Sequence, residues 1–141
     1  MSDILTAKDL LKKENATFVA VNGEKIFISH SRGVAPIIEI IDSDAELLCG
    51  ASVADKVIGK AAAMLLSKYK VKEIHALLVS EKALEYLDKK SISVTYDNVV
   101  AHIINRNKTD MCPMEKCVLN TTDEDEAEEL IRRKRQELMN R

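Results

Sequence analysis

Thr17-Phe18-Val19-Ala20-Val21 and Glu24-Lys25-Ile26-Phe27-Ile28, joined by Asn22-Gly23, form the stretch that decides the fold. Asn-Gly between two apolar runs favours a type I′ turn and predicts a β-hairpin. Successive side chains of a strand point to opposite faces. One face therefore carries Val19, Val21, Ile26 and Ile28, and the other carries Phe18, Ala20 and Phe27. Because both faces are apolar, we expect helices to cover both, as in a layered α/β domain.

The segments around the hairpin predict alternating helices and strands. Hydrophobic spacing and capping residues indicate helices over 3–14, 36–41, 52–69 and 81–90, a helix starting at Pro113, and a helix over 123–140. Short apolar runs indicate strands at 47–49, 74–79 and 92–96, and a strand or extended segment over 99–104. Strands that alternate with helices form parallel crossovers. We therefore expect an α/β fold with three α-β-α layers and a mixed, about five-stranded sheet, in which the N-terminal hairpin is followed by parallel crossovers.

Length and composition exclude several classes of protein. The 141 residues predict a single domain over 1–141, with 121–141 as a C-terminal helical extension. The net charge is −2, with 21 basic and 23 acidic residues intermixed and no Trp, so we expect no nucleic-acid partner. No apolar run is long enough to span a bilayer, and the start of the chain does not resemble a signal peptide. We therefore expect a cytoplasmic protein with no membrane partner.

Three segments carry a resemblance to a known family. They are Gly33-Val34-Ala35-Pro36, then Gly50-Ala51-Ser52-Val53-Ala54-Asp55-Lys56-Val57-Ile58-Gly59-Lys60-Ala61, then Asp110-Met111-Cys112-Pro113-Met114-Glu115-Lys116. In this order the chain resembles a small prokaryotic family of unknown function with the cytidine-deaminase-like fold, over about residues 4–120. The resemblance implies a cleft between the start of the 52–69 helix and the start of the Pro113 helix.

The resemblance also implies that the zinc site is degenerate. Zinc deaminases begin one helix with a His or Cys ligand and a Glu two residues later, and begin another with Pro-Cys-x-x-Cys. Val53-Ala54-Asp55 falls on the first motif, and Pro113-Met114-Glu115-Lys116-Cys117 on the second, so Cys117 is the one expected ligand that remains. We therefore expect no cofactor and no metal, zinc included. A rearranged site of Cys49, Cys112 and Cys117 is the alternative.

Seven residues are candidates for the site. Cys112 beside Pro113 is the candidate nucleophile, because a helix start lowers the pKa of a thiol. Asp55 is the second catalytic candidate, although Ser52-Val53-Ala54-Asp55 also fits a helix capping box. The candidate ligand-binding residues are Ser52, Lys56, Lys60, Arg106 and Glu115, which would hold an anion near a helix start. A solvated stripe is the alternative for the two lysines.

The sequence leaves three functions open. The first is a non-deaminating protein of the deaminase-like fold that binds a small anionic or nucleotide-like ligand, or a partner, in the former active-site cleft. The second is a thiol enzyme or sulfur or redox carrier using Cys112. The third is a zinc-dependent deaminase with a rearranged site. We also expect a homodimer, since symmetric dimers are the commonest oligomers.

Overall fold

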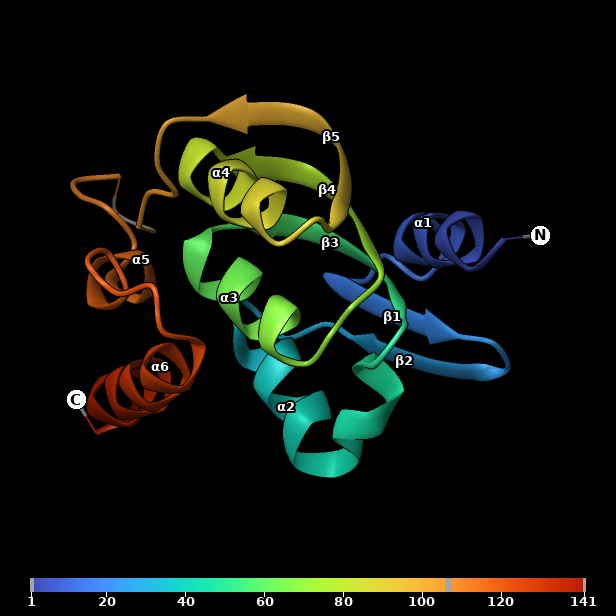
Figure 1. Ribbon diagram of the computed structural model, residues 1–141, viewed down its shortest axis with the longest axis horizontal. Coiled ribbons are helices and arrows are strands. Elements are labelled where there is room, and N and C mark those ends of the chain that lie inside the picture. The colour runs from blue at the N-terminus through green and yellow to red at the C-terminus, as the bar shows by residue number, and fades with distance from the viewer. Residues whose placement is uncertain (1, 106–107, 141) are drawn as a thin grey trace.

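A mixed five-stranded sheet organises the chain. The computed structural model describes residues 2–105 and 108–140. The strands are β1 (Phe18–Asn22), β2 (Lys25–Ser29), β3 (Ser52–Ile58), β4 (Glu73–Ser80) and β5 (Ser93–Val100). They lie in the order β2-β1-β3-β4-β5 (Figure 1). β1 pairs antiparallel with β2 and β3, and β3, β4 and β5 run parallel. The predicted hairpin followed by parallel crossovers is confirmed.

The hairpin has the predicted faces but a different turn. Val19 lies opposite Ile28 and Val21 opposite Ile26, so these four side chains share one face. The turn is wrong by one residue: Asn22 pairs with Lys25, which leaves Gly23-Glu24 as the two-residue loop. Gly23 has φ +65° at the first turn position, which is typical of the type II′ turn that starts with glycine. Asn22 instead donates from Nδ2 to the carbonyls of Leu47 and Cys49, at 2.9 Å each.

Helices cover both faces of the sheet and form three layers (Figure 1). α1 (Asp3–Lys13) packs on one face, where its buried Ala7 and Leu11 meet Val19, Val21 and Ala54. α2 (Ala35–Asp44), the 3₁₀ turn η1 (Ala45–Leu48), α3 (Lys60–Lys68) and α4 (Glu81–Lys89) lie on the other face. Ser2 and Ser80 cap α1 and α4, as predicted from the sequence.

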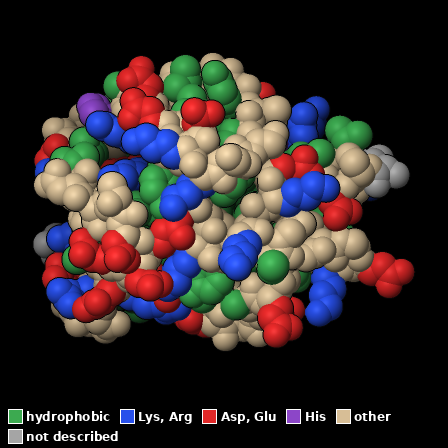
Figure 2. Space-filling model, viewed as in Figure 1, with side chains coloured by type: hydrophobic (Ala, Val, Ile, Leu, Met, Phe, Trp, Pro, Cys, Tyr) green, Lys and Arg blue, Asp and Glu red, His purple; other side chains and the backbone are tan. Residues whose placement is uncertain are grey.

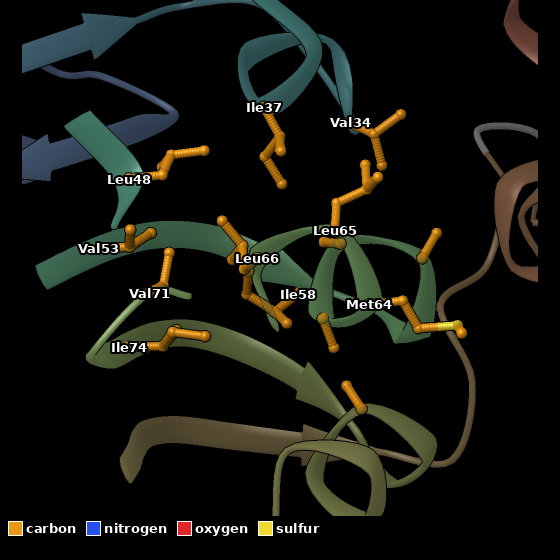
Figure 3. Close-up of a cluster of buried hydrophobic side chains, with 14 of the residues drawn as sticks. Val34, Ile37, Leu48, Val53, Ile58, Met64, Leu65, Leu66, Val71 and Ile74 are labelled. Atoms are coloured by element: carbon orange, nitrogen blue, oxygen red, sulfur yellow. The ribbon is translucent and has the colours of Figure 1, made fainter. Parts of the chain in front are cut away.

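The main core lies between α3 and the sheet. The six side chains from Ala61 to Leu66 are all buried, because α3 is enclosed by β3, α2, α4 and α6 (Glu124–Met139). Figure 3 shows Leu66 beside Ile58 and Leu65 reaching toward Val34 at the start of α2. Burial of this apolar surface is the main favourable term that fixes where α3 begins and ends.

Residues 52–69 do not form one helix, contrary to the prediction. Residues 52–58 are the strand β3, Gly59 follows, and α3 begins at Lys60. Val53, Val57 and Leu65 have a helical spacing that misled the interpretation, but β-branched residues favour a buried strand. The predicted strand at 47–49 is also wrong, because Ala45–Leu48 is a 3₁₀ turn that buries Leu47 and Leu48.

The C-terminal segment packs on the body of the domain. α6 lies beside α3 and buries Ala127 and Ile131 in the main core. α5 (Pro113–Cys117) starts at Pro113 as predicted and lies between α3 and α6. Along the described part of the chain, no helix combines the length and the apolar character needed to cross a membrane.

Candidate functional site

Three helices begin at the carboxyl edge of the sheet. β2 and β3 point the same way, because each is antiparallel to β1, and β4 is parallel to β3. α2, α3 and α4 follow β2, β3 and β4, so their N-terminal ends share this edge. In open α/β sheets, ligands bind outside the carboxyl ends of the strands. The edge is covered here by residues 101–105 and 108–119, which include α5 and which we call the covering segment.

The N-terminus of α3 holds the carboxylate of Glu115. The Lys60 N–H donates to Oε1 at 2.5 Å, and the Ala61 N–H donates to Oε2 at 3.0 Å. These two N–H groups have no acceptor within the helix, and the helix dipole favours a negative charge at this end. Burial raises the pKa of Glu115, and the bonds from Ala61 and Lys60 oppose that rise. Glu115 is therefore an internal anion bound at a helix start.

Gly59 and Lys60 complete the contact with α5. A Cβ atom at Gly59 would overlap the Glu115 carboxylate, so glycine lets the two segments approach. The Lys60 Nζ donates to the carbonyl oxygens of Val118 and Leu119, at 3.0 and 3.2 Å. We call Gly59, Lys60, Glu115 and the carbonyls of Val118 and Leu119 the Glu115 clamp. The clamp therefore joins the covering segment to the start of α3 through two sets of bonds: the α3 N–H groups hold Glu115, and the Lys60 ammonium group holds the two carbonyls.

Positive charge gathers next to the clamp. Burial lowers the pKa of Lys60, and Lys82 lowers it further, while Glu115 opposes the shift. Lys60, Lys82, Ser80, His102 and Glu115 line one small cavity at this edge. Figure 2 shows Lys and Arg side chains beside a histidine at the upper left of the visible face. The cavity is about 10 Å³, room for about one water molecule, so the covering segment fills the edge.

A larger cavity lies on the other side of α5. It measures about 330 Å³ and is lined by residues of α5 and α6 and by Asn105, Asp110 and Met111, of which Met111 borders both cavities. The covering segment therefore separates a filled space at the edge of the sheet from an open space beside α6.

Asp55 is buried in β3 and caps no helix, so the predicted capping box is wrong. Its Oδ1 accepts from the Val57 N–H at 3.2 Å, and its Oδ2 is buried with no hydrogen-bond partner. Burial raises the pKa of Asp55 to about 8, and the N–H groups of Val57 and Lys56 oppose that rise. The carboxyl is therefore mostly protonated at neutral pH.

Ser52 and Lys56 lie in β3 and not at a helix start, contrary to the prediction, and their role in ligand binding stays a prediction. Ser52 is at the amino end of β3, where its hydroxyl donates to Glu73 Oε2 at 2.6 Å. Lys56 is half-buried in the same strand. Neither residue lines the cavity at the carboxyl edge. The structure brings together only Lys60 and Glu115 of the predicted ligand-binding residues that it describes, and Arg106 lies outside the described residues.

The cysteines do not meet at one place. Cys49 precedes the amino end of β3, whereas Cys112 and Cys117 flank α5 at the other edge. The seven-residue strand between the edges spans about 20 Å, so the structure does not bring the three cysteines together. Within residues 2–105 and 108–140, no three His, Cys, Asp or Glu side chains gather closely enough to hold a metal ion.

Cys112 and Cys117 have different surroundings. Cys112 is the N-cap of α5, as predicted, and its N–H donates to the Ile103 carbonyl at 2.8 Å. The Cys117 thiol donates to the Met114 carbonyl at 3.1 Å, and burial raises its pKa to about 11. The role of Cys112 as a nucleophile stays a prediction.

Sequence reasoning missed Gly59, Lys82 and His102. The signal for Gly59 was available, because Ile58-Gly59-Lys60 follows a run of apolar and β-branched residues and can read as a strand end followed by a helix start. Lys82 and His102 carry no local signal, since only the fold brings them beside Lys60.

Two comparisons relate the chain to known proteins. A family model described as "TM1506: Domain of unknown function (DUF1893)" matches residues 6–134. The crystal structure of a DUF1893 family protein (TM1506) from Thermotoga maritima is similar, with a TM-score of 0.81 and 34% sequence identity. That similarity covers 94% of this chain and 88% of the other. No curated protein matches the chain. The expected family of unknown function is confirmed, whereas the deaminase-like fold stays a prediction.

Proposed function

The chain belongs to the DUF1893 family of unknown function, and we propose that it is a non-hydrolytic protein of the cytidine-deaminase-like fold. In this proposal it binds a small phosphate-bearing ligand at the carboxyl edge of its sheet. The observation that carries the proposal is the Glu115 carboxylate, which two consecutive N–H groups hold at the start of α3. A helix start of this kind is a general binding site for anions.

The charges around Glu115 favour a phosphate in its place. Lys60 and Lys82 line the same cavity, and Lys89 is close enough to lower the pKa of Lys60. A phosphate that replaces the carboxylate would keep an anion on the two N–H groups and gain the lysines as further partners. Because the cavity is filled in this structure, the ligand must displace Glu115, and the covering segment must move with it.

The residues at the helix starts argue against zinc hydrolysis. In zinc deaminases the ligands lie at the starts of two helices. The two helices that follow β2 and β3 begin with Val34-Ala35-Pro36 and Gly59-Lys60-Ala61. None of these residues is a His, Cys, Asp or Glu, so neither of these helix starts supplies a zinc ligand or a proton shuttle. At the Pro113 helix, where the sequence places the second motif, Met114 stands at the first thiolate position and Cys117 is the remaining ligand. Binding without hydrolysis is the reading of the deaminase-like fold that these residues support.

A titration with inorganic phosphate, followed by amide NMR shifts, tests the proposal. Wild-type protein should bind phosphate weakly, because Glu115 competes for the same N–H groups. Glu115→Ala should bind phosphate at least tenfold more tightly and shift the amides of Gly59, Lys60 and Ala61. If the Ala variant unfolds, Glu115→Gln replaces it in the comparison of phosphate affinity with wild type, because it keeps the shape of the side chain and removes its charge.

The controls separate a specific site from general charge effects. Glu129→Ala removes an exposed carboxylate from α6 and should leave phosphate affinity unchanged. Lys82→Met in the Glu115→Ala background should reduce the gain. A nucleoside 5′-monophosphate that binds more tightly than phosphate would indicate a nucleotide-like ligand. A folded Glu115 variant whose Lys60 and Ala61 amides do not respond saturably to phosphate would refute the proposal.

A further inference from the structure

The cavity between α5 and α6 is a second place where a ligand fits. Its volume of about 330 Å³ is at the lower end of the range for small-molecule sites. We propose that it binds a small organic acid, in which a carboxylate is attached to a compact apolar body. This inference is independent of the proposed function, because the cavity lies on the opposite side of α5 from the Glu115 clamp.

Two lysines from different helices supply the positive charge. Lys116 of α5 and Lys134 of α6 both line the cavity, and Asp110 is the acidic residue in its wall. Lys116 pairs with Asp110, and Lys134 pairs with Glu137 at 3.3 Å. Both carboxylates are more than half exposed, and exposed ion pairs contribute little to stability. A ligand carboxylate can therefore take over the lysines at small cost.

The remaining wall is uncharged and mostly apolar, with Asn105 as its polar side chain. Met111, Pro113 and Leu138 line the cavity and suit a compact hydrocarbon group. Cys117 also lines the space. Because burial holds its pKa near 11, it is neutral at physiological pH and does not repel an anion. The wall thus joins a cationic part, which suits a carboxylate, to an apolar part, which suits a hydrocarbon group. An inorganic anion would contact only the cationic part.

Benzoate is the probe, with benzamide and acetate as its matched controls. Benzoate has both the charge and the apolar ring, benzamide has the ring without the charge, and acetate has the charge with only a methyl group. We expect benzoate to bind with a dissociation constant on the order of 1 mM, as for other ligands of this size. It should shift the amides of Lys116, Cys117 and Leu138 in a saturable way, whereas benzamide and acetate should bind at least fivefold more weakly.

A pair of lysine variants locates the charge. Lys134→Met keeps most of the aliphatic side chain and removes the ammonium group, and should weaken benzoate binding at least fivefold. Lys12→Met, on α1 across the sheet, should have no effect. Equal binding of benzamide, or an unchanged affinity in Lys134→Met, would overturn the assignment of an organic acid.

The same spectra separate this site from the proposed phosphate site. Saturable shifts confined to Gly59, Lys60 and Ala61 would place benzoate at the start of α3 and overturn the α5–α6 site. Shifts at Lys116, Cys117 and Leu138 that persist in Glu115→Ala would support this site whether or not phosphate binds at the clamp.

Discussion

At the scale of single residues, Asp55 is an unusual feature of the core. It is 5% exposed, lies between Phe18 of β1 and Ala76 of β4, and its Oδ2 has no hydrogen-bond partner. A buried polar atom without a partner costs free energy. Protonation reduces that cost, which is why burial raises the pKa of Asp55.

The titration of Asp55 makes a prediction with a definite sign. The pKa is about 8 in the folded protein and about 3.9 in the unfolded chain. Between these values the unfolded chain loses the proton first, so the wild-type protein loses stability as pH rises from about 4 to about 8. Asp55→Asn keeps an acceptor for the Val57 N–H and removes the titration. Its stability relative to wild type should rise by about 4 kcal/mol between pH 4 and pH 7, as measured by urea unfolding.

A surface aspartate serves as the control for this measurement. Asp9→Asn, on the exposed side of α1, should give a stability difference from wild type that hardly changes with pH. If the stability difference for Asp55→Asn also hardly changes with pH, the Asp55 carboxyl is ionised in the folded protein. That result would contradict a buried carboxyl whose Oδ2 lacks a partner.

At the scale of elements, β3 shows where the sequence could not be interpreted locally. The segment from Ser52 to Ile58 is apolar enough to be a buried strand or a buried helix, and short apolar runs do not separate the two. The decision comes from pairing: β3 forms ladders with both β1 and β4, and neither partner is local. β4 could be predicted, because the run from Ile74 to Val79 is apolar and contains no Asp, Glu, Lys or Arg that would mark the exposed face of a helix.

The same limit affected the candidate site. Shifting the helix start from 52 to Lys60 removes Ser52, Asp55 and Lys56 from the cleft at once. Lys60 and Glu115 still meet, because the sequence correctly predicted a helix that starts at Pro113, and the start of α3 lies against it. The partner of Glu115 could not be predicted, since it is a pair of backbone N–H groups 54 and 55 residues away.

The carboxylate of Glu128 adds polar contacts to the apolar packing that holds α6 on the domain. Glu128 accepts from the Tyr69 hydroxyl at 2.6 Å, from Lys68 at 2.9 Å and from Arg132 Nε at 2.9 Å, and Arg132 reaches on to Asp42 at 2.8 Å. Burial would raise the pKa of Glu128, but these donors prevail and lower it to about 2. Glu128 therefore joins α6 to α3, and through Arg132 to α2.

We predict that Glu128→Gln weakens this junction in a pH-dependent way. The unfolded pKa of Glu is about 4.3, so the stabilisation is complete above that value and is lost as pH falls toward 2. The variant should lose on the order of 2 kcal/mol at pH 7, and the loss should vanish near pH 2. Glu129→Gln, whose partner Arg133 is exposed, should stay within about 0.5 kcal/mol of wild type. Equal effects of the two substitutions in thermal unfolding would contradict this role for Glu128.

At the scale of the whole molecule, the layered fold could be predicted although one strand and one helix start were wrong. The hairpin and β4 identify a sheet with two apolar faces, and Ala61 to Leu66 supply an apolar helix to cover one of them. A sheet that must be covered on both faces has few arrangements, so errors in 47–58 changed the strand boundaries without changing the layers. The full strand order β2-β1-β3-β4-β5 was not predictable, because it follows from pairing between strands that are distant in the sequence.

The two outer strands of the sheet, β2 and β5, differ in how well they resist pairing with another chain. β2 is a short strand that starts with Lys25, whereas β5 has eight residues, of which Asp97 is the charged one. β5 also exposes Tyr96 and Val99, each at 45%. Long edge strands with few charges pair readily with a second chain. We therefore expect the predicted homodimer to form by antiparallel pairing of β5 with β5 of a second copy.

Sedimentation equilibrium can test this arrangement with variants at both edges. The wild-type protein should sediment as a dimer at high concentration, and Val99→Lys should sediment as a monomer at the same concentration, because a lysine on the edge strand brings a charge into the pairing surface. Ile26→Lys makes the same change on β2, where Ile26 is 48% exposed, and should leave the dimer intact. A dimer that survives Val99→Lys but dissociates in Ile26→Lys would place the interface on β2. A wild-type protein that is a monomer at all concentrations would contradict the predicted homodimer.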